Sequence, residues 1–309
     1  MNKVCMKTIF AILILFPYVR NQVLETDSVP REVFLTEGLK NPVIYDPNEV
    51  YEKNKHLLSA NSEEKEHAEE IMKSAKRMFL RYATNDYTFK LYERYGDNTN
   101  LYFKKCKGDK YVGKIHTKIH YPNKYNEIVK ILWDPNGEKE YNRDFVNGKV
   151  VRAYDPNLLM IQQRYRNGFM RRHNYFYAFS AKHETSNNTT IIVKASGNIN
   201  DHNKNRKYSE NLLLRTANLF KFDVDPDSDI AAGRLNNMVV DLSGYIITKK
   251  KDHVEIIHVD SFHDNHPENP QWYKLVKRSE RLGSVIELRE YIDDKYTYSP
   301  KLGDYSYVF

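Results

Sequence analysis

Apolar residues recur at steps of three and four residues in two stretches of the chain, and this spacing predicts two long amphipathic helices. The first follows a polar cap region at Ser62 and carries Ala68, Ile71, Met72, Ala75, Met78, Phe79 and Tyr82. The second begins after Pro270 and carries Trp272, Leu275, Val276, Leu282, Val285, Ile286 and Tyr291. Because each helix has one apolar face, we expect both to pack against another layer of the fold.

Between these helices the period of the pattern changes to two, which predicts antiparallel strands joined by turns. The alternation is clearest over residues 113–120, and further strands are predicted at 101–103, 149–154, 158–166, 174–182, 189–196, 238–248 and 254–260. A short helix is predicted between Pro122 and Trp133, and another over residues 212–222. This order of elements predicts an α+β fold, in which an antiparallel sheet is flanked by an N-terminal helix and a long C-terminal helix. The space between sheet and helix is filled either by side chains or by a ligand, and periodicity does not choose between them.

The start of the chain has a different pattern, in which Lys3 and Lys7 precede a short apolar run at residues 9–16. This pattern predicts a secretory signal peptide over residues 1–22, with a retained signal anchor as the alternative. The run is far shorter than the roughly twenty residues that span a bilayer. Residues 23–62 are polar and interrupted by prolines, which predicts a poorly ordered extension. The predicted domain therefore covers residues 63–295, followed by a tail over residues 296–309.

Composition adds that the fold must be stable without a disulfide. Hydrophobic residues make up 40% of the 309 residues, and one of the two cysteines, Cys5, lies in the predicted signal peptide. Cys106 is then alone, so the core has to be large enough to need no covalent link. The net charge of +7 fits attraction to an anionic membrane or an ordinary lysine-rich surface. No dense basic block interleaves with aromatic residues, so we do not expect nucleic-acid binding.

Residue patterns that would carry catalysis are weak. The sequence has no glycine-rich phosphate loop and no Gly-x-Ser-x-Gly turn. Cys106 lies among lysines that could lower its pKa, but nothing supplies a base, so an incidental thiol is expected. Four histidines between residues 253 and 266, with Asp260 and Asp264, follow no zinc spacing. We therefore expect no metal, no cofactor and no enzymatic activity. Asn187 and Asn188 begin overlapping glycosylation sequons.

Several segments resemble the fam-a (Pyst-A) multigene family of malaria parasites. They are residues 92–105 (YERYGDNTNLYFKK), 130–135 (KILWDP), 158–165 (LLMIQQRY), 197–203 (GNINDHN) and 242–247 (LSGYII), and they occur in order over about residues 60–295. That family is described as carrying a START-type lipid-transfer domain. The wider START pattern is also similar at Trp133-Asp134, at residues 171–177, at Ser243-Gly244-Tyr245-Ile246, and at Asp260 with Pro270-Gln271-Trp272. Residues 261–269 are longer and more polar than the usual loop of the family.

The resemblance implies a START-like helix-grip fold, in which a curved antiparallel sheet wraps around the C-terminal helix. It also implies an internal apolar tunnel that holds a phospholipid, most simply one resembling phosphatidylcholine. It implies transfer of this lipid without covalent chemistry, transient contact with a membrane, and a monomer. It also implies secretion into the parasitophorous vacuole or export into the host cell. A phosphate group calls for a cation and a quaternary ammonium for aromatic faces. The lipid-binding residues predicted on these grounds are Trp133, Tyr154, Arg164, Tyr165, Tyr177 and Trp272.

In this interpretation the last helix is a lid that opens at the membrane. Two alternatives stay open. One is an exported antigen or interaction protein that keeps the fold with a collapsed cavity, and the other is a helix-grip enzyme that uses polar groups inside the cavity.

Overall fold

The computed structural model describes residues 46–96, 99–106, 110–166, 172–205, 210–264 and 271–297, all within one compact unit. The α-helices are α2 (Glu49–Lys53), α3 (Ser62–Thr84), α4 (Tyr125–Trp133), α5 (Ser228–Ala231) and α6 (Gln271–Thr297). The strands are β1 (Lys90–Arg94), β2 (Asn100–Lys105), β3 (Tyr111–Ile119), β4 (Phe145–Asp155), β5 (Leu158–Tyr165), β6 (Asn174–Ser186), β7 (Thr189–Ala195), β8 (Asn198–Asn200), β9 (Lys221–Asp223), β10 (Asn236–Lys249) and β11 (Val254–Asp264).

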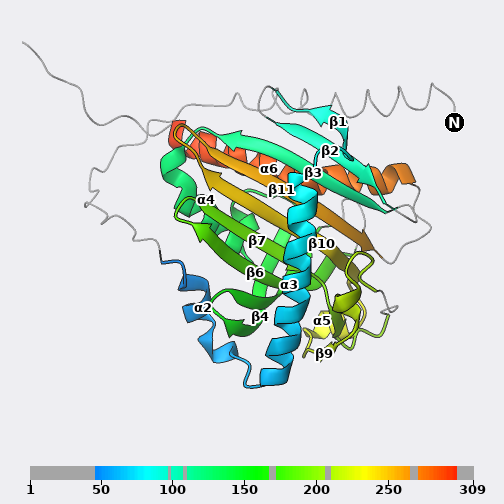
Figure 1. Ribbon diagram of the computed structural model, residues 1–309. Coiled ribbons are helices and arrows are strands. Elements are labelled where there is room, and N and C mark those ends of the chain that lie inside the picture. The colour runs from blue at the N-terminus through cyan, green and yellow to red at the C-terminus, as the bar shows by residue number, and fades with distance from the viewer. Residues whose placement is uncertain are drawn as a thin grey trace, which may run out of the picture. The chain divides into compact units, whose positions relative to one another are not determined.

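The centre of the fold is a nine-stranded sheet with the order β1-β2-β3-β11-β10-β7-β6-β5-β4 (Figure 1). Neighbouring strands in this order run antiparallel. A second pair, β8 with β9, is parallel and separate from the large sheet. Among the described residues, no helix is long and apolar enough to cross a membrane.

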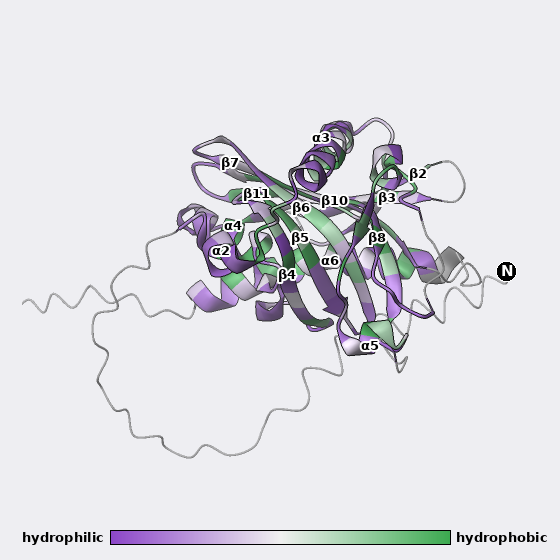
Figure 2. Cartoon of the chain, turned by 90° about the horizontal axis from the view of Figure 1, so that it is seen from below, coloured by the Kyte–Doolittle hydropathy of each residue, from purple (hydrophilic) through white to green (hydrophobic). Residues whose placement is uncertain are grey.

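Helices cover both faces of the curved sheet (Figures 1 and 2). One face packs on α3, and we call it the outer face; its core includes Leu158 and Met160 of β5. The opposite face packs on α4 and α6, and we call it the inner face; its core includes Leu159 and Ile161 of the same strand. Since successive side chains of a strand point to opposite faces, each central strand contributes to both cores.

Helix α3 forms where the sequence predicts it, and a side-chain cap begins it. The side chain of Asn61 accepts a hydrogen bond of 3.1 Å from the backbone nitrogen of Glu64. The apolar stripe of α3 lies on the outer face, where Phe79 is fully buried. Gly244 of β10 allows this packing, because a Cβ there would lie 2.9 Å from Phe79 and 2.5 Å from the carbonyl oxygen of Ile192.

Replacing this glycine should be costly. Gly244→Ala is expected to lower the free energy of unfolding by about 1–3 kcal/mol, because the carbonyl of Ile192 belongs to the sheet and cannot yield. Urea denaturation measures the change. The matched control is Gly283→Ala within α6, where a Cβ meets nothing within 4 Å. That variant should match the wild type or exceed its stability by about 0.5–1 kcal/mol. Equal stability of Gly244→Ala and wild type would contradict the close packing.

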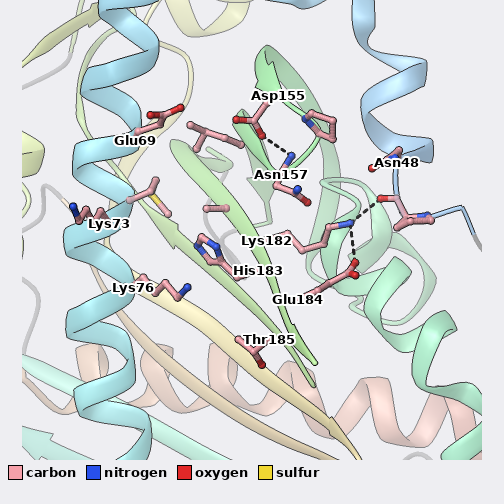
Figure 3. Close-up of a pocket in the computed structure, with 15 residues that line it drawn as sticks. Asn48, Glu69, Lys73, Lys76, Asp155, Asn157, Lys182, His183, Glu184 and Thr185 are labelled. Carbon is pink, nitrogen blue, oxygen red and sulfur yellow. Dashed lines mark hydrogen bonds and ion pairs between the residues drawn. The ribbon is translucent and has the colours of Figure 1, made fainter. Parts of the chain in front are cut away.

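The predicted architecture is confirmed: the protein is an α+β helix-grip fold in which a curved antiparallel sheet holds the long C-terminal helix α6. Strand β6 extends past its neighbour, since β5 pairs with it only as far as Ala181. Beyond that residue, Lys182–Thr185 border an open pocket beside α3 (Figure 3).

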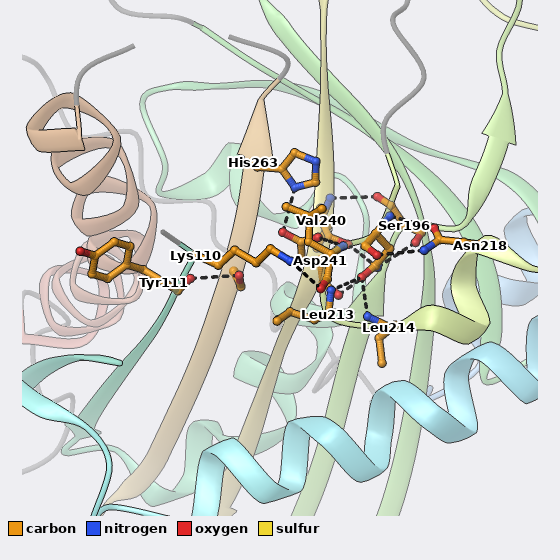
Figure 4. Close-up of polar contacts among 12 residues, drawn as sticks. Lys110, Tyr111, Ser196, Leu213, Leu214, Asn218, Val240, Asp241 and His263 are labelled. Atoms are coloured by element: carbon orange, nitrogen blue, oxygen red, sulfur yellow. Dashed lines mark hydrogen bonds and ion pairs between the residues drawn. The ribbon is translucent and has the colours of Figure 1, made fainter. Parts of the chain in front are cut away.

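The predicted helix over residues 212–222 is wrong. The chain there forms a short 3-10 helix (Arg215–Asn218) followed by β9. The side chain of Asn211 accepts hydrogen bonds from the backbone nitrogens of Leu213 and Leu214, and that of Asp241 accepts one from Leu212 (Figure 4). These contacts satisfy backbone nitrogens that the first turn of a helix leaves without partners, so they do not exclude a helix by themselves. The helix does not reach Phe222 because residues 221–223 pair with β8.

Part of the predicted extension is ordered. Within residues 23–62, α2 and a 3-10 helix (Lys55–Leu57) are formed, and Val50 of α2 is buried in the inner core. A single buried residue leaves no periodicity for sequence reasoning to find.

Strand β1 was not predicted either, because all five of its residues are exposed. The predicted signal peptide and most of the predicted tail lie outside the described residues.

Candidate functional site

A band of buried polar side chains crosses the middle of the inner face, beneath α6. We call it the inner polar band. It draws on five strands or helices and the 3-10 helix Gly137–Glu140, and its members are Glu138, Gln163, Tyr165, Lys194, Tyr245, His258, Asp260 and Arg281. All of them except Arg281 are buried, and Arg281 is partly buried. Polar groups are costly to bury unless they are paired, so such a band needs an explanation beyond packing.

The centre of the band is an ion pair between β11 and α6. The Nε of Arg281 donates to Asp260 across 3.0 Å, and the Asp260 side chain is only 2% exposed. Burial opposes ionisation of Asp260, but the charge of Arg281 outweighs it and holds the pKa of Asp260 below its usual value. The guanidinium of Arg281 also lies 4.8 Å from the ring centre of Phe262 and 5.4 Å from that of Tyr165. Asp260 therefore ties α6 to the sheet.

Lys194 is the buried cation of the band with the fewest partners. Within the described part of the chain, its Nζ has one hydrogen-bond acceptor, the Oε1 of Gln163 at 3.3 Å. Burial lowers the pKa of Lys194, and Glu138 and Asp260 only partly offset this effect. Glu138 itself accepts a hydrogen bond of 2.9 Å from the hydroxyl of Tyr165. An ammonium ion with three donors has capacity here for an additional acceptor.

His258 completes the band next to Lys194. Its ring stacks on that of Tyr245, with 4.3 Å between ring centres, and its Nδ1 donates to the carbonyl of Gly244 across 2.8 Å. Burial lowers the pKa of His258 below the usual value for a histidine, which is about 6.5. The imidazole is therefore neutral in the folded protein near pH 7.

This predicts a specific acid sensitivity. The unfolded chain binds a proton at this histidine near pH 6.5, whereas the folded one resists it, so stability falls as the pH drops below about 6.5. One such group changes the free energy of unfolding by at most about 1.4 kcal/mol per pH unit. In His258→Gln this component should disappear, as measured by urea denaturation between pH 5 and pH 8. An unchanged slope in the variant would contradict a buried neutral imidazole. His183→Gln serves as the comparison, because burial also lowers the pKa of that histidine, outside the band.

Apolar side chains flank the inner polar band on both sides along the sheet. One flank belongs to the inner core around Ile192 and Ile247, and the other consists of Phe145, Phe176, Met238 and Phe262. The second flank borders a cavity of about 80 Å³ that Tyr165, Lys277 and Arg281 also line. The described residues of the inner face therefore form an amphipathic lining, with charges in the middle.

The pocket on the outer face is larger but offers less selective chemistry (Figure 3). It measures about 900 Å³ and lies between α3, the β4–β5 turn and the end of β6. Cationic and anionic side chains both line it: Glu69, Lys73, Lys76, Asp155, Lys182 and Glu184. The Nζ of Lys182 donates to the carbonyl oxygen of Pro47 across 2.7 Å and lies 3.7 Å from the Oε1 of Glu184. Because this lining favours neither sign of charge, we place the candidate site at the inner polar band.

The structure brings one of the predicted lipid-binding residues, Tyr165, into the inner polar band. Trp133 ends α4 and is buried in the inner core, with the Nζ of Lys182 5.5 Å from its ring. The side chain of Trp272 lies outside the described part of the chain.

The other three predicted residues lie on the outer face, away from the band. The guanidinium of Arg164 is paired with Asp229 at 2.7 Å and with Asp227. Tyr154 donates to Glu64 of α3 at 2.5 Å, and Tyr177 belongs to the outer core. Arg164 and Tyr165 are adjacent in sequence, so they point to opposite faces of β5. The sequence alone does not say which face is covered by α6.

Sequence reasoning also missed Lys194, His258, Asp260 and Arg281 as one group. A signal was present, because a charged residue interrupts an apolar run in IIVKA of β7 and in IIHVD of β11. The histidines considered as metal ligands do not converge: His253 pairs with Asp252, and His263 with Asp241. His266 lies outside the described residues. Among the residues that are described, no group of three or more histidine, cysteine or acidic side chains is placed to hold a metal.

No model of a known protein family matches the chain, and no curated protein matches it. Solved structures do. Human StAR-related lipid transfer protein 5 matches with a TM-score of 0.54 at 9% identity, over 74% of this chain and 97% of that one. The protein has a START-like helix-grip fold. Human STARD10 also matches, with a TM-score of 0.49 at 13% identity, over 72% of this chain and 82% of that one. The match to human StAR-related lipid transfer protein 5 supports the START-like fold, and an identity of 9% leaves the activity of this chain open.

Proposed function

We propose that the protein binds one phospholipid between the sheet and α6 and carries it between membranes without covalent chemistry. The observation that carries this proposal is the amphipathic lining of the inner face, in which charged groups lie between two apolar regions. A lipid has the same division into a polar headgroup and apolar chains. The START-like fold supports the proposal, since the matched human protein is named for lipid transfer.

The inner polar band is suited to a phosphocholine headgroup. Lys194 and Arg281 supply cations for the phosphate oxygens, and the Nζ of Lys194 has donor capacity left. The rings of Tyr165 and Tyr245 supply faces for the quaternary ammonium group. The binding site we propose therefore replaces Arg164 by Lys194 and Arg281 as the phosphate ligands, and it retains Tyr165.

The apolar flanks account for the acyl chains. Drawing two chains out of a bilayer into water exposes on the order of two dozen methylenes, at about 0.8 kcal/mol each. The resulting penalty of roughly 20 kcal/mol prevents spontaneous transfer, and a carrier removes it by offering apolar side chains instead of water. Binding of this kind requires no nucleophile, metal or cofactor.

Uptake requires α6 to move. The cavity of about 80 Å³ beside Arg281 is smaller than the roughly 300–1,000 Å³ of typical ligand sites. Helix α6 holds the inner face through Leu282, Val285, Leu288 and Ile292, and at its C-terminal end Lys295 pairs with Glu127 of α4 at 2.7 Å. A lid hinged at this end opens beside Arg281 and the second apolar flank.

Transfer of a fluorescent phosphatidylcholine between labelled and unlabelled vesicles tests the proposal. We expect transfer that depends on protein concentration, with the lipid mass unchanged after the reaction. Absence of transfer would contradict the carrier function. A change in lipid mass would favour a helix-grip enzyme instead.

One observation favours a second function, that of an interaction protein or antigen with a collapsed cavity. Arg281 and Asp260 satisfy each other, and the cavity beside them is small. The secretory route and the vacuolar or host-cell destination rest on the N-terminal pattern and on the fam-a resemblance, and they are part of this proposal. So are a monomeric state and the absence of nucleic-acid binding.

A further inference from the structure

Exposed apolar side chains gather at one edge of the large sheet. The described part of the chain has six large hydrophobic residues that are exposed, and three of them lie within six positions of one another. Tyr87 precedes β1 and is 100% exposed, and Leu91 and Tyr92 of β1 are 45% and 46% exposed. Isolated apolar residues on a surface are ordinary, but a group of them beside a groove indicates a binding surface.

The groove next to these residues leads from the sheet edge to α6. It measures about 400 Å³, and its apolar wall includes Leu91, Tyr92, Phe103, Tyr111 and Leu275. Tyr92 meets Phe103 edge to face, with 5.1 Å between ring centres. Lys90 and Lys105 also line the groove. The surface thus combines aromatic rings, aliphatic chains and cations.

The charge of this edge is positive. Strands β1 and β2 carry Lys90, Arg94, Lys104 and Lys105 against the single acidic residue Glu93. The carboxylate of Glu93 accepts a hydrogen bond of 2.6 Å from Tyr95. Tyrosines and basic residues together are typical of surfaces that rest on the headgroups of an anionic bilayer.

A second strand from another protein is a poorer occupant. Edge strands are protected from strand addition by lysines and by bulges. Strand β1 has Lys90 and Arg94, and its pairing with β2 is irregular between Leu91 and Glu93. The edge is therefore unsuited to pairing with a further strand, whereas its exposed apolar and basic side chains are suited to contact with a lipid bilayer.

We propose that the Tyr87 loop, β1 and the groove up to Leu275 dock the protein on an anionic phospholipid bilayer. This docking face rests on the proposed carrier function, because it brings the N-terminal half of α6 to the membrane. Leu275 lines the groove and lies less than two helical turns before Arg281. When the N-terminal half of α6 moves toward the bilayer together with Leu275, the end of the inner polar band at Arg281 is uncovered.

Two pairs of substitutions and one control test the docking face by co-sedimentation with vesicles. Lys90→Glu with Lys105→Glu should weaken binding to vesicles of phosphatidylcholine and phosphatidylserine by at least about 25-fold, since each basic residue near such a surface contributes about fivefold. Leu91→Ser with Tyr92→Ser should weaken it by at least about tenfold. The control is Leu58→Ser, because Leu58 is 47% exposed and lies beside β4 at the opposite edge of the sheet.

Leu58→Ser should bind vesicles like the wild type. Binding of both paired variants at the wild-type level, or of the wild type to no vesicles, would overturn the docking face. Lipid that co-purifies with each protein is quantified in parallel. A wild type that carries lipid but ignores vesicles would sink the docking face alone, whereas a wild type that binds vesicles but carries no lipid would sink the carrier function alone.

Discussion

Arg281→Met is expected to lower the free energy of unfolding by about 3–5 kcal/mol, because it leaves the carboxylate of Asp260 buried without its partner. The Asp260 side chain is 2% exposed, and Arg281 is the cation that holds its pKa low against the effect of burial. Urea denaturation at pH 7, followed by circular dichroism, measures the loss. A loss below about 1 kcal/mol would show that the pair is not buried as described.

The matched control removes both charges. Asp260→Leu combined with Arg281→Met should recover most of the lost stability, since replacing a buried ion pair by apolar residues is often neutral. The double variant also tests function, because it keeps the fold and removes a cation from the proposed headgroup site. We expect it to be stable and to bind phosphatidylcholine more weakly than the wild type.

Lys194→Met is expected to weaken phospholipid binding by about tenfold to 150-fold, the range for a lost hydrogen bond to a charged group. Stability should stay the same or rise, because burial lowers the pKa of Lys194 and so disfavours its charged form. Weaker binding together with equal or higher stability is expected for a residue that serves binding and not folding. Displacement of a fluorescent phosphatidylcholine and urea denaturation, measured on the same preparation, give the two quantities.

Lys182→Met is the matched control for this experiment. Lys182 is another buried lysine of the sheet, and burial lowers its pKa as well. Its Nζ donates to the carbonyl of Pro47 and lies 5.5 Å from the ring centre of Trp133, so unlike the Nζ of Lys194 it already has a backbone acceptor. Lipid binding by Lys182→Met should equal that of the wild type. If Lys194→Met also binds normally, Lys194 is not part of the headgroup site.

The periodicity of the sequence was sufficient to predict the layers of the fold. The stripe from Ala68 to Tyr82 and the pattern after Pro270 predicted α3 and α6, because a helix that buries one face repeats its apolar residues. The helix predicted over residues 212–222 does not form, because residues 221–223 pair with β8. Pairing of this kind depends on a distant segment, which the local periodicity does not reveal.

The candidate site was predictable only in part. Arg164 and Tyr165 looked equally suitable in the sequence, but one pairs with Asp229 on the outer face and the other with Glu138 on the inner face. Which face of β5 is covered by α6 depends on the complete sheet. The charged residues Lys194 and Asp260 were visible as interruptions of apolar strands. An ionisable residue within an otherwise apolar strand therefore indicates a candidate site, as an aromatic residue does.

The central claim is that one lipid occupies the space between the sheet and α6. Native mass spectrometry of the purified protein, followed by extraction into organic solvent, tests it most directly. We predict one phospholipid per chain, lost in the Lys194→Met variant and kept in Lys182→Met. A lipid-free protein that takes up no lipid after incubation with phosphatidylcholine vesicles would contradict the claim.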